Sequence, residues 1–218
     1  MKVEFSPVSI AVDVNDLIDK TVELAKGLKT HLGWLKSMPN VARQRLDDVL
    51  VEIDKTFVAV DNVVREHLEV ALDPSIIGTK PDVILHLAGP TLPMRIKQDR
   101  GHCHAIGQIY WQYLKGILDP LLVGNINAQS EIDRIFTHLS NADNDLFDGF
   151  EKVGSVLQER AKRALVLQLG NDVEGAQRLV REDVGRLIEM RQHLQDAHLT
   201  LVGIRNDFIK AMSPPVPV

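Results

Sequence analysis

The chain has 218 residues, of which 44% are hydrophobic and 25% are charged, and these fractions are close to the averages of folded globular proteins. They exclude a disordered or collagen-like chain, and the single cysteine excludes an intramolecular disulfide framework. The net charge of −5 gives no overall basic field for nucleic acid or an anionic membrane. No apolar run reaches the roughly 18–20 residues of a membrane-spanning helix, and the first residues lack the layout of a signal peptide, so we expect a cytoplasmic protein.

Two helices are predicted over about 15–37 and 40–72, because apolar residues recur there at three- and four-residue steps. Pro39 separates them, since proline moves the residue before it out of the helical region. We expect these two helices to form an antiparallel hairpin. On the second helix, the side opposite the apolar stripe is charged, which indicates a face exposed to water: Asp47, Asp48, Asp54, Lys55, Asp61 and Arg65.

The third predicted helix starts at about residue 97 or 101 and ends at about 119. Its apolar residues, among them Tyr110, Trp111 and Ile117, cover most of the circumference rather than one stripe. A helix of this kind is usually buried in the centre of a bundle or at an oligomer interface. We therefore expect it to be central or to lie in an interface, with Trp111 largely buried.

The fourth and fifth predicted helices cover about 127–168 and 172–212. Ser130 and Asp133 resemble a capping box near the start of the fourth helix, and Asn171 with Glu174 forms one at the start of the fifth. Gly170 suits the left-handed residue that often ends a helix. We expect the two helices to pair antiparallel as a long hairpin through a heptad seam on the fifth: Leu187, Met190, Leu194, Ala197, Leu201 and Ile204.

Residues 73–101 contain four prolines and are predicted to form an irregular crossover, in which 83–88 make either a short helix or an extended piece. The crossover is either a structural element that closes the bundle or a functional surface beside the third helix. As a surface it offers cationic and titratable groups to an acidic peptide or a small anionic ligand. The candidate binding residues are His86, Arg95, Arg100, His102, His104 and Trp111.

Together these elements predict an all-α fold, an elongated bundle of about five helices with two antiparallel hairpins and one central or interface helix. We expect a single domain over 1–212 that includes the crossover at 73–101. Residues 213–218 form a proline-rich tail, which is typical of polyproline II or disorder.

Helical bundles that bind metals commonly use Glu-x-x-His, which places both ligands on one helix face. None of the eight histidines has a glutamate three residues before it. The densest set of potential ligands is His102-Cys103-His104 with Asp99, but consecutive helical residues point in different directions, and zinc needs converging ligands. We favour a buried cysteine here, keep these four residues as the alternative site of a metal- or ligand-binding bundle, and expect no cofactor.

Arg191 and His198 share one face of the fifth predicted helix. Their spacing resembles the Arg-x4–6-His motif of HEPN-type helical ribonucleases. The resemblance implies a histidine that moves a proton and an arginine that stabilises phosphorane charge. It covers only eight residues, and the polar residue that usually follows the arginine is Gln192 here. The alternative is a solvated helix face beside the heptad seam.

Other catalytic patterns are absent from the sequence, including the Gly-x-Ser-x-Gly elbow and the Gly-x-x-x-x-Gly-Lys-Ser/Thr phosphate loop. We therefore expect a non-enzymatic scaffold or regulatory module that binds another protein. The alternatives are the HEPN-like ribonuclease and the metal- or ligand-binding bundle. A homodimer is a further expectation because the third helix has more apolar surface than one bundle needs. The acidic balance disfavours a membrane or nucleic-acid partner.

Overall fold

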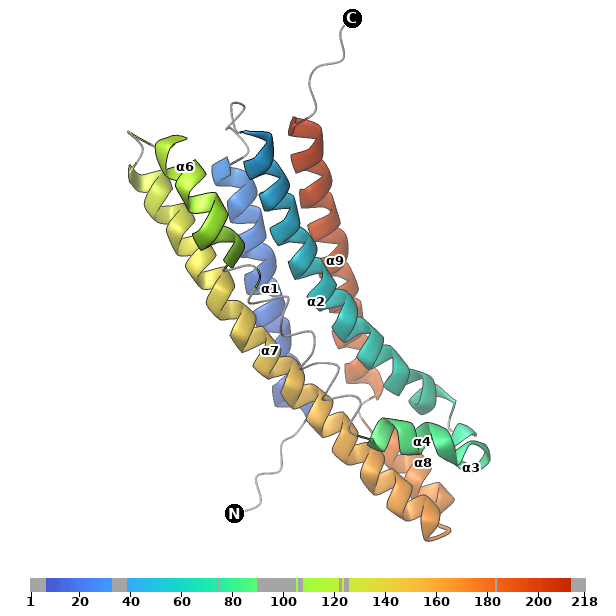
Figure 1. The fold of residues 1–218 in the computed structure, drawn as a ribbon. Helices are drawn as coiled ribbons and strands as arrows, with labels where there is room; N and C mark the ends of the chain where they lie inside the picture. The colour runs from blue at the N-terminus through green and yellow to red at the C-terminus, as the bar shows by residue number, and fades with distance from the viewer. Residues whose placement is uncertain are drawn as a thin grey trace, which may run out of the picture.

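The computed structural model describes residues 7–32, 39–73, 75–89, 105, 108–121, 123, 126–182 and 184–212. All regular structure within these ranges is helical, which confirms the all-α prediction. α7 has 44 residues and is about 66 Å long if straight, so the molecule is elongated. The long helices that lie side by side in Figure 1 are α1 (Pro7–Leu32), α2 (Asn40–Leu72), α7 (Ile126–Leu169) and α9 (Val184–Met212).

The core of the bundle is built from the apolar stripes that the sequence periodicity predicts. On α2, buried side chains recur at three- and four-residue steps from Ala42 to Ala71, so one side of the helix faces the core along its whole length. Ile18 of α1, Phe57 of α2 and Leu194 of α9 belong to the same buried cluster. None of the described helices combines the length with the apolarity that a bilayer-spanning segment needs.

The pairing of the long helices differs from the prediction. α9 packs against α2 and α1, whereas α7 packs against α1, α4 and α8, so the long hairpin predicted from 127–168 and 172–212 is wrong. The physical reason is a break in the fifth predicted helix. α8 (Val173–Arg181) packs back along α7 and is followed by its C-cap residue Glu182. α9 begins at Val184 and packs along α2 and α1 instead. α1 and α2 share α9 as a neighbour rather than forming a closely packed hairpin of their own.

The opposite end of the molecule from α6 is formed by short helices around the end of α7 (Figure 1). α3 (Ile76–Thr79) and α4 (Pro81–Ala88) occupy part of the predicted crossover, and α4 packs on α7. Proline is tolerated at the first position of α4 because that backbone nitrogen needs no helical partner. Ile84 and Leu87 of α4 join Ala161 and Ala164 of α7 in a second hydrophobic cluster, so the short-helix alternative for 83–88 is the one observed.

The described part of the third predicted helix is irregular. η1 (Tyr110–Leu114) is a single π-helical turn in which the Lys115 N–H donates to the Tyr110 carbonyl five residues back, and it continues into α6 (Lys115–Leu121). Tyr110 and Leu114 face the core, but Trp111 is 51% exposed. The prediction that Trp111 is largely buried is therefore wrong for the single chain. Apolar residues surround most of this helix, but the bundle covers only one side of it.

Two predicted caps are also corrected. Asn171, rather than Gly170, has a left-handed backbone with a φ of 63°, which asparagine tolerates better than most residues. Asp172 caps α8, because its carboxylate accepts from the Gly175 N–H at 2.8 Å. Asp133 lies well inside α7 and caps nothing, since that helix already begins at Ile126.

Candidate protein-binding surface

Two exposed aromatic side chains lie on η1. Trp111 and Tyr113 are each 51% exposed, and Gln112 between them is exposed as well. Side chains two positions apart on a helical turn point to nearly opposite sides, so the two rings lie on the flanks of η1 with Gln112 at its crest. We call Trp111, Gln112 and Tyr113 the aromatic ridge. Single π-helical turns are frequent at functional sites.

A cation lies over each ring of the aromatic ridge. The Arg45 guanidinium of α2 lies 5.0 Å from the centre of the Tyr113 ring. The Lys115 ammonium lies 5.4 Å from the centre of the Trp111 ring. Contacts of this kind stabilise the ring orientation by about 0.5–1 kcal/mol at exposed sites. The rings are therefore held in place although half of their surface faces water.

Tyr110, the buried residue next to the ridge, attaches η1 to α7. Its ring is stacked on Phe136 of α7, with ring centres 3.9 Å apart and planes 9° from parallel. Its hydroxyl donates to the Asp133 carboxylate, which also accepts from Lys115 at 2.6 and 2.8 Å. η1 is thus attached to α7 by a buried ring and by one shared carboxylate, which gives the exposed residues a rigid base.

The charges of this network reinforce one another. Burial, followed by the hydrogen bond to Asp133, raises the pKa of Tyr110, so the phenol stays protonated as a donor. Burial alone would raise the pKa of Asp133, but the hydrogen bonds from Lys115 and Tyr110 outweigh it and lower that pKa. The hydrogen bond to Asp133 raises the pKa of Lys115. The carboxylate and the ammonium therefore remain ionised around neutral pH.

The cations beside the aromatic ridge are neutralised within the chain. Arg45 pairs with Asp48 at 3.1 Å, and Lys115 pairs with Asp133 and, at 3.6 Å, with Asp119. The ridge thus presents aromatic surface without an excess of positive charge. The acidic peptide or anionic ligand expected at the basic residues near the crossover stays a prediction, because most of those residues lie outside the described part of the chain.

The structure describes two of the candidate binding residues, and these two lie far apart. Trp111 lies on η1, next to α6, whereas His86 lies exposed on α4 at the other end of the molecule (Figure 1). The remaining candidates lie outside the described residues, as do the alternative metal ligands and the tail 213–218: Arg95, Asp99, Arg100, His102, Cys103 and His104. Within the described ranges, no three His, Cys, Asp or Glu side chains are grouped in a way that could hold a metal ion.

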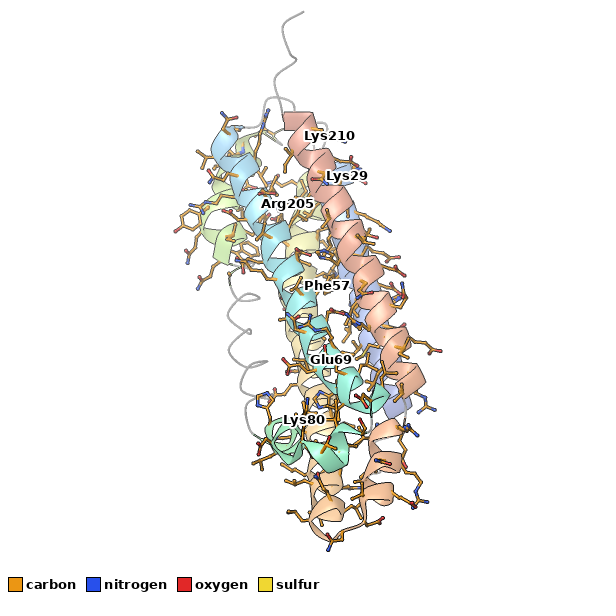
Figure 2. The ribbon with its side chains drawn as sticks, turned by 90° about the vertical axis from the view of Figure 1, so that its right-hand side faces the viewer. Lys29, Phe57, Glu69, Lys80, Arg205 and Lys210 are labelled. Carbon is orange, nitrogen blue, oxygen red and sulfur yellow. The ribbon has the colours of Figure 1, made fainter. Side chains whose placement is uncertain are left out.

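The structure gives Arg191 and His198 partners on α2. Both are rungs of a charged ladder along the seam of α2 and α9, which lie side by side in Figure 2 with Arg205 labelled. The rungs are seven residues apart on each helix, as expected for two antiparallel helices in heptad register. We call these pairs the α2–α9 ladder: Arg191 with Asp61 at 2.9 Å, His198 with Asp54, and Arg205 with Asp47 at 2.5 and 2.9 Å.

The α2–α9 ladder gives the HEPN-like spacing a structural explanation. Each of the two residues faces a carboxylate of α2, and Arg205 at the same spacing does likewise. The spacing of seven that fits a ribonuclease motif is also the spacing that two packed helices require. The acidic side of α2 that the sequence analysis assigned to water instead supplies the carboxylates of the ladder.

Two features were missed by sequence reasoning. The first is the Tyr110–Asp133–Lys115 network, in which Asp133 is distant in sequence from the other two residues and no common motif joins the three. The second is His67, a buried histidine on the apolar side of α2. A histidine within an apolar stripe is a visible signal, but its surroundings come from four other helices.

Comparisons with protein-family models, with curated proteins and with solved structures found no match to this chain.

Proposed function

We propose that this chain is a non-enzymatic helical module of the cytoplasm that binds another protein through the aromatic ridge on η1. The observation that carries the proposal is the half-exposure of Trp111 and Tyr113 on a π-helical turn whose base is anchored in the bundle. Tryptophan, tyrosine and arginine are the residues most enriched at binding hot spots. Rigid aromatic side chains also lose little conformational entropy on binding.

The charge balance indicates what kind of partner fits. Because Asp48, Asp119 and Asp133 pair with Arg45 and Lys115, the ridge has no excess of positive charge to select an acidic partner. Apolar contact with the exposed ring faces is the remaining source of affinity. The partner we propose is therefore an uncharged segment of another protein, whose aliphatic or proline side chains lie across η1 and contact both rings.

A photocrosslinking experiment tests this proposal without removing the rings. A photoreactive phenylalanine derivative replaces Gln112 at the crest of the ridge, and the same derivative replaces Leu199, which is 66% exposed on α9, in a matched control. The crosslinked protein is identified, purified separately, and its affinity for the native chain is measured by calorimetry. We expect crosslinks from position 112 that are absent from position 199.

The affinity measurement decides the outcome. Trp111→Ala and Tyr113→Ala should each weaken binding by at least tenfold, since hot-spot residues contribute upwards of about 2 kcal/mol. Leu199→Ala should change the affinity by less than twofold. A partner that binds both ridge variants as tightly as the native chain would contradict the proposal. If the chain instead forms a dimer that depends on Trp111, the ridge serves self-association and the proposal of a different partner protein is wrong.

A further inference from the structure

His67 lies where the two hydrophobic clusters of the molecule meet. It is 7% exposed and lies near the end of α2. Its neighbours Val64 and Leu68 belong to the bundle core, whereas Val70 belongs to the second cluster. In Figure 2, Glu69 marks this part of α2, and Lys80 marks the junction of α3 and α4 below it. A polar ring at this boundary is unusual, because histidine can form two hydrogen bonds and the surrounding side chains are mostly apolar.

One ring nitrogen is satisfied and the other is not. Nδ1 lies 3.1 Å from the Val63 carbonyl oxygen, which can only accept, so Nδ1 carries the proton of the neutral ring. Nε2 therefore presents its lone pair, and it finds no hydrogen-bond partner among the described residues. The ring borders a cavity of about 20 Å³, which has room for one water molecule but not for an organic ligand.

The cavity is formed by five helices. α2 contributes His67, α4 contributes Leu87, α7 contributes Arg160, and α8 and α9 contribute the apolar side chains Val180 and Leu187. Both hydrophobic clusters reach it, so the cavity lies on the junction between the bundle and the α3–α4–α8 end.

The groups that face His67 disfavour its protonation. Burial is the largest effect and lowers the pKa of His67 below the ordinary value of 6.5, and the positive charge of Arg160 and the neighbouring His86 act in the same direction. Glu66 and the Val63 carbonyl act in the opposite direction but do not outweigh them. Arg160 is itself held in place, since it donates to the Glu182 carbonyl oxygen at 2.6 Å.

We propose that His67 is an acid-sensitive latch that joins the bundle to the α3–α4–α8 end when its ring is neutral and releases that end when the ring is protonated. A protonated ring places an Nε2–H donor and a full charge in an apolar cavity beside Arg160. Water reaches that charge most easily if α4 moves away from α7. α4 is only eight residues long, so its local opening requires less free energy than unfolding of the whole bundle.

The direction of the pH dependence follows from linkage. The open form exposes His67 to water and restores its ordinary pKa, so it binds more protons than the closed form once the pH falls below about 6.5. The closed form is fully stable above that pH and loses stability as the pH decreases toward the lowered pKa. For one titrating group, the opening constant increases by at most roughly tenfold per pH unit in this window.

Hydrogen exchange of the full chain, corrected for the intrinsic effect of pH, tests the latch at pH 7.5 and 5.5. We expect the opening of α4 to increase relative to that of α9, by up to the tenfold limit of roughly one proton over this range. His67→Asn keeps a donor for the Val63 carbonyl but does not titrate, so this variant should lose the increase. His138→Asn, which alters an exposed histidine of α7 that does not border the cavity, is the matched control and should retain it.

Three results would overturn the proposal. The first is equal α4 protection of the native chain at both pH values, and the second is an unchanged pH dependence in His67→Asn. The third is parallel loss of protection in α4 and α9, which would mean that the whole molecule opens. If His67→Asn does not fold, an NMR titration of the native chain decides, because a His67 pKa at or above 6.5 excludes the latch and a lower value supports it.

Discussion

Replacing Arg191 and Asp61 by alanine, singly and together, measures one rung of the α2–α9 ladder. The two side chains are 32% and 23% exposed and their nearest atoms are 2.9 Å apart, so the pair is only partly screened by water. We expect each single substitution to reduce the free energy of unfolding by about 1 kcal/mol, since exposed pairs contribute 0.2–1 kcal/mol and the remaining charge is left half-buried. For a chain of this length, that change lowers Tm by about 2–4 °C.

The coupling energy between the two substitutions is the decisive quantity. Urea unfolding of the four proteins should give a coupling of about 0.5 kcal/mol that decreases in 0.5 M salt, because salt screens the pair. Lys210→Ala, at the other end of α9, combined with Asp61→Ala is the control and should be additive. A coupling of zero for Arg191 and Asp61 would refute the ladder register.

The same variants separate the structural role of the α2–α9 ladder from the HEPN-like alternative. We expect neither the native chain nor Arg191→Ala to cleave single-stranded RNA, because the arginine is occupied by Asp61. RNA cleavage that is lost in Arg191→Ala while its Tm stays unchanged would favour the ribonuclease.

Three further substitutions probe the packing and the caps. Leu194→Asp places an unpaired carboxylate at a site that is 1% exposed and should destabilise the fold by several kcal/mol, seen as a large loss of Tm by circular dichroism, whereas an unchanged Tm would contradict the burial. Asp172→Ala removes the cap from the Gly175 N–H and should reduce stability by about 1 kcal/mol in urea unfolding. Tyr110→Phe removes the hydroxyl donor to Asp133 and should reduce stability by about 1 kcal/mol, checked in the same way.

The sequence periodicity predicts the helices well because burial acts on each helix separately. The second predicted helix, over 40–72, matches α2, and the fourth, over 127–168, matches α7 to within a residue at each end. An apolar stripe requires only that one side of the helix leaves water. The pattern therefore does not indicate which helix covers the stripe.

Pairing was less predictable for that reason. The seam from Leu187 to Ile204 fits any apolar surface of the right length. The prediction paired it with α7 because α7 is the preceding long helix in the chain. The signal for the true partner was electrostatic. α2 has aspartates at 47, 54 and 61, and α9 has basic side chains at 191, 198 and 205, so both series repeat every seven residues. Matching these two series would have paired α9 with α2 and fixed the antiparallel register.

Trp111 shows why apolarity alone does not predict burial in this chain. A helix that is apolar around most of its circumference needs cover on every side, but the bundle covers only the side that carries Tyr110 and Leu114. These two buried residues are four positions apart, and the three consecutive side chains between them remain outside the core. Tryptophan and tyrosine tolerate this position because their rings combine apolar faces with a polar atom. The apolar excess that predicted a buried helix is thus the same excess that leaves the aromatic ridge open to a partner.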